Sequence, residues 1–154
     1  MSTIKYIKAD NYNTPEGAWR DILQFIPLDK KLWLPFYNDG TAKCIISKLG
    51  YESIHYNKDF FSYVADNEYL LIDNPPFSIK DSVLEKCFKI SRPFCLLLPL
   101  DTIERKYFKK YTKGLQLIIP DSRYKYSKSS PPFKSVWCCW GMSQYIGNEQ
   151  LIFL

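Results

Sequence analysis

Five consecutive residues, Asp73-Asn74-Pro75-Pro76-Phe77, combine polar, rigid and aromatic groups directly after an apolar run at 69–72. A short apolar run predicts a buried strand. The two prolines cannot continue that strand, because proline fixes φ and lacks a backbone N–H donor. The chain must therefore turn where the strand ends. In open α/β sheets, ligands bind at this carboxyl edge.

The chemistry that these residues suit is methylation of an amine on a planar base. The Asn74 side-chain oxygen and the Pro75 carbonyl can each accept one amine hydrogen, while Phe77 stacks on a flipped-out base. The nitrogen lone pair is then directed out of the ring plane. It can attack a sulfonium methyl group without a strong general base. The alternative is a plain Asn-Pro turn with Phe77 in the core.

The motif at 73–77 resembles the Asn/Asp-Pro-Pro-Phe/Tyr motif of S-adenosylmethionine-dependent amino-methyltransferases, chiefly those that methylate adenine at its 6-amino group. The string Pro-Phe-Tyr-Asn-Asp-Gly at 35–40 resembles a form found in small adenine methyltransferase-like proteins of protists and large DNA viruses. Together the resemblance covers residues 14–140. It implies methyl transfer to adenine in nucleic acid, with DNA slightly favoured over RNA.

The same resemblance implies a binding site for S-adenosylmethionine. Its residues would be Thr14, Pro35, Phe36, Asp39, Gly40, Asn57, Asp59, Phe60 and Asp73. Asp59 would accept from the cofactor's adenine amine, and Phe60 would pack on that ring. The sequence departs from the family pattern where an acid normally binds the ribose hydroxyls, because Tyr56 or Asn57 stands there. An amide lacks the charge-assisted strength of a carboxylate.

Several of these positions also have an ordinary structural interpretation. Thr14 can be the N-cap of a helix that has Pro15 in its first turn, and Asp39-Gly40 can be a simple turn. Asp59 can be a loop acid beside a core aromatic residue. The only histidine, His55, is expected to be structural.

Strand and helix patterns alternate along the chain. Apolar runs predict strands near 32–36, 53–56, 69–72, 93–100, 115–120 and 135–140, and helical spacing predicts helices near 14–26, 41–49, 79–88 and 103–111. This order is typical of a Rossmann-like, class I methyltransferase fold of the α/β class. It has a mostly parallel central sheet, helices on both faces and an antiparallel terminal hairpin. We expect one domain over 1–154 without a separate target-recognition domain.

The segment at 121–134 alternates cations with aromatic rings and is long for a loop. Its candidate nucleic-acid contacts are Arg123, Tyr124, Lys125, Tyr126, Lys128 and Lys134. Cations suit phosphate contacts and aromatic rings suit base stacking. The basic predicted helix at 103–111 is the other candidate. The net charge of +5 is compatible with a polyanionic partner.

The remaining composition favours a soluble intracellular protein with no membrane partner. The chain begins without an apolar signal region, and no apolar run approaches the roughly 18 residues of a membrane span. Its five cysteines have no CxxC spacing, which indicates reduced core thiols rather than a disulfide or metal site.

Two other functions fit the sequence. One is a catalytically inactive subunit of the same fold that binds nucleic acid or scaffolds a partner, which the missing ribose carboxylate and the glycine-poor first loop favour. The other is methylation of a glutamine amide in a protein, since the motif can present any planar amine. A homodimer, or a heterodimer with a methyltransferase-like subunit, is compatible with the apolar tail at 151–154.

Overall fold

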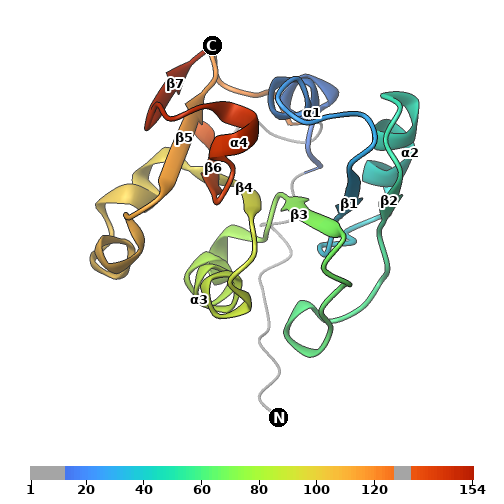
Figure 1. Ribbon diagram of the computed structural model, residues 1–154, viewed down its shortest axis with the longest axis horizontal. Coiled ribbons are helices and arrows are strands. Elements are labelled where there is room, and N and C mark those ends of the chain that lie inside the picture. The colour runs from blue at the N-terminus through green and yellow to red at the C-terminus, as the bar shows by residue number, and fades with distance from the viewer. Residues whose placement is uncertain (1–12, 127–132) are drawn as a thin grey trace.

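A seven-stranded sheet forms the centre of the protein, with strand order β2-β1-β3-β4-β6-β5-β7 (Figure 1). The computed structural model describes residues 13–126 and 133–154. The strands are β1 (Lys31–Trp33), β2 (Ser53–Ile54), β3 (Tyr69–Asp73), β4 (Phe94–Pro99), β5 (Leu115–Ile119), β6 (Ser135–Trp140) and β7 (Leu151–Phe153). The α-helices are α1 (Glu16–Leu23), α2 (Thr41–Lys48), α3 (Lys80–Ile90) and α4 (Ser143–Ile146). Short 3-10 helices are η2 (Phe60–Ser62), η3 (Phe77–Ile79), η4 (Leu100–Glu104) and η5 (Lys106–Tyr111).

The sheet is mostly parallel, as the sequence predicts. Strand β1 runs parallel to β2 and β3, and β3 runs parallel to β4. Strand β6 lies antiparallel between β4 and β5, which gives the predicted terminal hairpin. The carboxyl ends of β1, β3, β4 and β5 therefore share one edge of the sheet, and the central motif lies at this edge.

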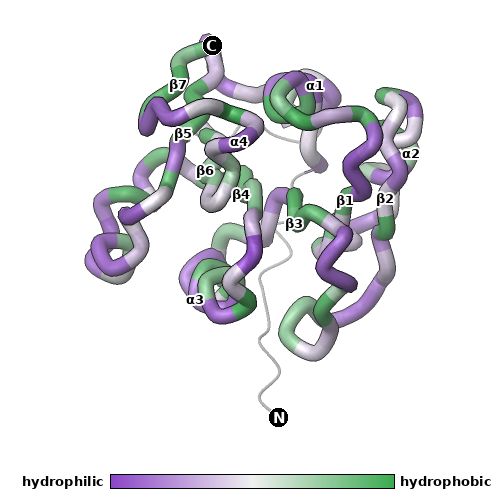
Figure 2. Tube along the Cα trace, in the orientation of Figure 1, coloured by the Kyte–Doolittle hydropathy of each residue, from purple (hydrophilic) through white to green (hydrophobic). Residues whose placement is uncertain are grey.

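The side chains of the central strands alternate between two apolar layers. In β4, which is buried along its whole length, Cys95 and Leu97 face the layer covered by α1, α2 and α4. Phe94, Leu96 and Leu98 face the layer covered by α3 and η5. A strand covered on both faces needs a continuous apolar run, which explains the composition of β4. Figure 2 shows apolar residues along the central strands, between helices of mixed polarity.

All five cysteines are free, as the sequence indicates. Four of them, Cys87, Cys95, Cys138 and Cys139, lie buried in the two layers, and Cys44 is exposed. Burial raises the pKa of the Cys87 thiol to about 12. The buried thiols therefore act as small apolar core residues.

The structure differs from the sequence prediction mainly after β4. The predicted helix at 103–111 is two 3-10 helices, η4 and η5, because Arg105 between them is extended, with φ −71° and ψ 142°. Few residues of this segment are buried, Thr102 and Phe108 among them, so it lacks the broad apolar face that stabilises a longer α-helix. The tail packs back on the sheet as β7, beside β5. None of the helices at 13–126 and 133–154 has the length and apolar character needed to cross a membrane.

Candidate active site

The central motif links two loops at the carboxyl edge of the sheet. Asp73 ends β3 with its side chain buried. Its Oδ2 accepts from the backbone N–H of Phe36 at 2.7 Å, and its Oδ1 accepts from the N–H of Asn74 at 2.8 Å. One carboxyl group therefore fixes the segment after β1 to the turn after β3. Burial raises the pKa of Asp73 to about 8, although both hydrogen bonds oppose this shift.

Asn74 is held by a residue far away in the sequence. Its Nδ2 donates to Oγ1 of Thr14 at 3.0 Å. The prediction that Thr14 caps α1 is wrong, because the N-cap is Pro15 and no side chain caps the helix. The hydroxyl of Thr14 instead orients the Asn74 amide. Pro75 and Pro76, both buried, then turn the chain into η3.

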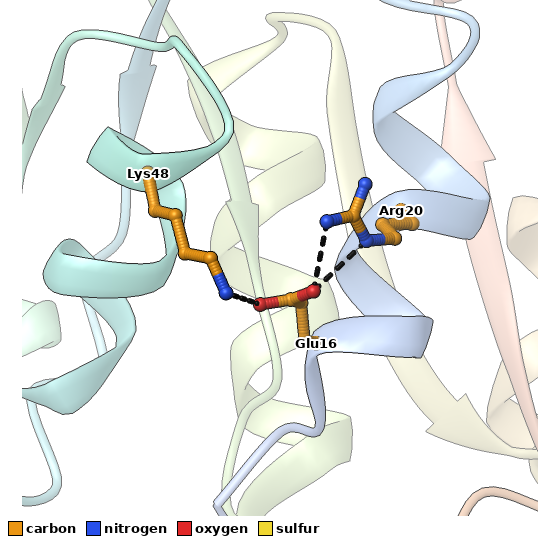
Figure 3. A network of polar contacts seen from close by, with 3 residues as sticks. All are labelled: Glu16, Arg20 and Lys48. Carbon is orange, nitrogen blue, oxygen red and sulfur yellow. Dashed lines mark hydrogen bonds and ion pairs between the residues drawn. The ribbon is translucent and has the colours of Figure 1, made fainter.

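An ion-pair cluster fixes α1 beside α2, close to Thr14. Figure 3 shows Glu16 between Arg20 of its own helix and Lys48 of α2. Glu16 Oε2 lies 2.9 Å from Arg20 Nη2, and Oε1 lies 2.9 Å from Lys48 Nζ. Hydrogen bonds from Lys48 and Arg20 lower the pKa of Glu16, and the bond from Lys48 has the larger effect. Because the cluster is exposed, it contributes little stability.

The turn between β1 and α2 carries a second polar group. Asp39 Oδ1 accepts from the backbone N–H of Thr41 at 3.0 Å and from its hydroxyl at 2.7 Å. Asp39 Oδ2 accepts from Asn13 Nδ2 at 3.0 Å, and the Asn13 side-chain oxygen accepts from the Asn38 amide. These hydrogen bonds lower the pKa of Asp39, and the bond from the Thr41 N–H has the largest effect. The carboxylate therefore lies charged at the N-terminus of α2.

Gly40 is required by the shape of this turn. Its φ is +82°, a conformation that L side chains rarely adopt. A Cβ atom would also lie 2.7 Å from the hydroxyl oxygen of Tyr37, which folds over Gly40. Tyr37 in turn packs against His55, whose Nδ1 lies 2.8 Å from the Leu34 carbonyl. His55 is buried.

Two hollows share Phe36 and Tyr37 in their linings. The smaller, of about 30 Å³, is lined by Asn13, Thr14, Phe36, Tyr37, Asn38, Asp39, Thr41, Ala42, Asp73 and Asn74. The larger, of about 280 Å³, is lined by Pro35, Phe36, Tyr37, Asn57, Lys58, Asp59, Phe60, Phe61, Pro76 and Ile79. All the residues predicted to bind the cofactor line one of these hollows, except Gly40, which lies under Tyr37.

The larger hollow has an aromatic wall and one carboxylate at its rim. Phe60 is buried, with its ring centroid 5.0 Å from that of Phe36. Asp59 is exposed and caps η2, where it accepts from the Phe61 N–H at 3.1 Å and from the Ser62 hydroxyl at 2.8 Å. A carboxylate has about four acceptor positions, so Asp59 can accept from a further donor. Asn57 at the same rim is exposed.

Phe77 is covered on its open side. Only 7% of the residue is exposed, and its ring lies edge-on to Phe133, with centroids 5.2 Å apart and an interplanar angle of 67°. Phe133 also lines a hollow of about 430 Å³ beside η4. At this exposure a base can stack on Phe77 only after the groups packed on its ring, Phe133 among them, move aside. The contact also shows that the end of the loop at 121–134 reaches the central motif.

The described part of this loop combines anchored tyrosines with exposed cations. Tyr124 donates to Asp21 Oδ2 of α1 at 2.6 Å, and burial raises the pKa of its hydroxyl. Tyr126 is buried, with its hydroxyl 2.9 Å from that of Ser135. The ring of Tyr126 is therefore not presented for base stacking in this conformation, whereas Tyr124 is half-buried. Arg123 and Lys125 are exposed and Lys134 is half-buried, whereas Lys128 lies outside the described residues.

The structure adds residues that the sequence did not indicate. Asn13 joins the site through Asp39, although nothing in its local sequence marks it. Tyr37 lines both hollows, and Lys58 lies at the rim of the larger one with its Nζ 4.4 Å from the centre of the Tyr63 ring. Lys58 therefore places a positive charge at the rim where the family pattern has a ribose-binding acid.

The strand order, the antiparallel β6 and the position of the hollows define a Rossmann-like methyltransferase fold. The chain is similar to the crystal structure of the 23S rRNA methyltransferase ErmE, with a TM-score of 0.56 and 10% sequence identity, over 84% of this chain and 68% of that chain. At this identity the likeness concerns the fold. No protein-family model matches the sequence. No curated protein matches it either.

Proposed function

We propose that this protein transfers a methyl group from S-adenosylmethionine to the 6-amino group of adenine in nucleic acid. The observation that carries the proposal is the position of Asn74. It directly follows β3 at the ligand-binding edge of a methyltransferase fold, where its amide donates to Thr14 and the residue lines the smaller hollow. The structural neighbour is a methyltransferase of 23S rRNA, which supports a nucleic-acid substrate.

The residues around Phe36 and Tyr37 fit S-adenosylmethionine by their chemistry. The larger hollow offers aromatic faces from Phe36 and Phe60 and an acceptor from Asp59, which suit a flat base with an exocyclic amine. Its volume of about 280 Å³ is close to the lower end of the usual range for ligand pockets. The charged Asp39 lines the smaller hollow and suits the ammonium end of the cofactor. When bound, the cofactor supplies the electrophilic methyl group.

Asn74 and Pro75 act on the amine, not on the base ring. Their oxygens accept its two hydrogens, so the nitrogen lone pair no longer conjugates with the ring and is directed toward the methyl group. No strong base is required, because the methylated nitrogen would take over the positive charge of the sulfonium, become strongly acidic and release one of its hydrogens to water. Phe77 holds the base by stacking after Phe133 has moved aside.

The test is methyl transfer by the purified chain, together with calorimetry of cofactor binding. We expect radiolabelled methyl groups to pass from S-adenosylmethionine to DNA or RNA oligonucleotides that contain adenine, and not to matched oligonucleotides without adenine. A chain that binds S-adenosylmethionine but labels neither nucleic acid contradicts the proposed substrate. Labelling of a glutamine-containing peptide instead would support methylation of a protein amide.

An inactive subunit that binds nucleic acid is the second candidate function. Two observations favour it: the rim of the larger hollow carries Asn57 and Lys58 where a ribose-binding acid is expected, and Phe77 is buried against Phe133. The calorimetry separates the two functions. Oligonucleotide binding without any cofactor binding would support the inactive subunit.

Replacing Thr14 by valine tests whether its hydroxyl orients Asn74. The change keeps the shape of the side chain and removes the acceptor at 3.0 Å from Asn74 Nδ2. We expect kcat to fall by about 3- to 10-fold, the value of one net hydrogen bond, with the KM for S-adenosylmethionine unchanged. Thr14→Ser keeps the hydroxyl and should restore the rate. A raised KM at constant kcat would instead place Thr14 in the cofactor site.

The salt dependence of binding tests the loop at 121–134. Arg123 and Lys125 are exposed and follow the carboxyl end of β5. Replacing both by alanine should flatten the slope of log affinity against log salt by about 1.4–1.8, because each phosphate contact contributes about 0.7–0.9. The control replaces two exposed lysines at the opposite edge, Lys89 and Lys113. Equal slopes for the two variants would show that the loop does not grip phosphates.

A further inference from the structure

The outer edge of β7 is an exposed strand that is suited to pair with another strand. β7 is the last strand in the sheet order, and no strand of the described residues pairs with its outer side. Two of its side chains are among the most exposed large apolar groups of the described chain, with 53% of Leu151 and 72% of Phe153 accessible. No side chain at 151–154 is charged, and none of these residues is a proline. Native sheets normally protect such an edge with those residues.

The register of β7 determines which backbone groups are available. The Leu117 N–H donates to the Gln150 carbonyl at 2.9 Å, and the Leu154 N–H donates to the Ile119 carbonyl at 3.0 Å. The backbone groups of residues 150, 152 and 154 therefore point toward β5. Because these groups alternate along a strand, the N–H and C=O of Leu151 and Phe153 point to the outer edge. The side chains of both residues lie on the same face of the sheet.

We propose that two copies of this chain associate through β7, pairing antiparallel about a two-fold axis at Ile152. In this register Leu151 of each copy lies opposite Phe153 of the other, and their outward N–H and C=O groups form hydrogen-bonded pairs. Each exposed aromatic side chain then covers an exposed aliphatic one across the axis. A second copy is the favoured partner because this edge is complementary to itself and its side chains carry no like charges that would repel those of its copy.

The contact is short, so the dimer is weak. β7 has three residues, and interfaces below about 1,200 Å² are typical of transient association. We therefore expect a dissociation constant in the micromolar range. The dimer leaves the proposed function intact. β7 runs in the same direction as β3 and β4, so antiparallel pairing puts the two candidate active sites at opposite edges of the combined sheet. Each site stays open to its own substrate.

Sedimentation of the purified chain over a range of concentrations tests the association. The weight-average mass should rise from 18.2 kDa toward twice that value. Phe153→Lys should keep the chain monomeric over the same range, because a charge is then opposed to Leu151 of the second copy. The control is Leu28→Lys, at a side chain that is 66% exposed and lies before β1, which should behave as the unmodified chain. A chain that stays monomeric at every concentration, or a dimer that survives Phe153→Lys, overturns the proposal.

Disulfide crosslinking tests the register independently. Cys44, the exposed thiol, is first replaced by serine. In the proposed register, Leu151→Cys and Phe153→Cys proteins should crosslink to each other when mixed, because opposed residues in a hydrogen-bonded pair lie about 5.5 Å apart at Cα. Neither should crosslink to itself, because equivalent residues are then offset by two positions, beyond the reach of about 7 Å for a disulfide. Self-crosslinking of either variant as fast as the mixture would contradict the axis at Ile152.

Discussion

Replacing Asn74 by alanine is expected to reduce methyl transfer by at least about a hundredfold, while the chain stays folded. The loss follows from the role of the amide oxygen, which positions the amine for attack. Removal of one preorganised polar group in an active site typically costs a factor of about 10²–10³ in rate. The hydrogen bond to Thr14 is lost from the folded state, which corresponds to about 0.5–1.5 kcal/mol. The measurement is kcat with saturating cofactor, beside a urea unfolding curve.

The matched control for this variant is Asn67→Ala. Asn67 lies before β3 at the opposite edge of the sheet, and its side-chain oxygen accepts a hydrogen bond from Arg92 at 3.2 Å. Its loss should change stability by a similar amount and leave the rate unchanged. If Asn74→Ala keeps its activity and loses its fold, Asn74 is a structural turn residue. The motif would then have no catalytic function.

The parts of the fold that follow from local patterns were predictable. The core strands have continuous or alternating apolar residues, and the helices α1, α2 and α3 have apolar faces that recur every three to four residues. The hairpin of β5 and β6 followed from the order of the runs. The two 3-10 helices after β4 did not, because the charges at 103–111 occur at spacings that fit an α-helix equally well. The segment forms 3-10 helices because few of its described side chains are buried, and this burial is visible only in three dimensions.

The candidate site shows the same division between local and distant information. Asp73, Asn74 and Pro75 follow one another in the chain, so their proximity and rigidity are encoded locally. The contact of Asn74 with Thr14 joins residues that are 60 positions apart. No spacing rule predicts such a contact, since it depends on how α1 packs on the sheet. Asn13 was missed for the same reason.

The aromatic residues were the hardest to assign from sequence. Phe77 and Tyr126 have ring types that suit base stacking, yet both are buried in the described conformation. A ring that stacks on a substrate and a ring that stacks on a neighbour are identical in the sequence. Phe133 decides between these roles, because it covers Phe77 from a loop that lies more than 50 positions later in the chain.

The protein is expected to lose stability as the pH rises from 5 to 8, because of Asp73. Burial raises the pKa of this carboxyl from 3.8 to about 8 in the folded state. Between these two values, the folded chain retains a proton that the unfolded chain releases. Asp73 therefore stabilises the fold fully below about pH 4, and this contribution falls as the pH approaches about 8. The largest possible slope is about 1.4 kcal/mol per pH unit. Glu16 and Asp39 have lowered pKa values, so they titrate below this range.

Asp73→Asn isolates this effect, since its side chain stays neutral at every pH. Its single oxygen can accept only one of the two N–H bonds, from Phe36 or Asn74, and its amide nitrogen faces the other donor. The variant should therefore be less stable than the unmodified chain at pH 5, by about 1–3 kcal/mol. Its stability should change little with pH, so the difference narrows toward pH 8. Urea unfolding at each pH measures both curves, with the exposed Asp101→Asn as the control that keeps the slope. A slope that persists in Asp73→Asn would assign the pH dependence to another group and leave Asp73 charged in the folded protein.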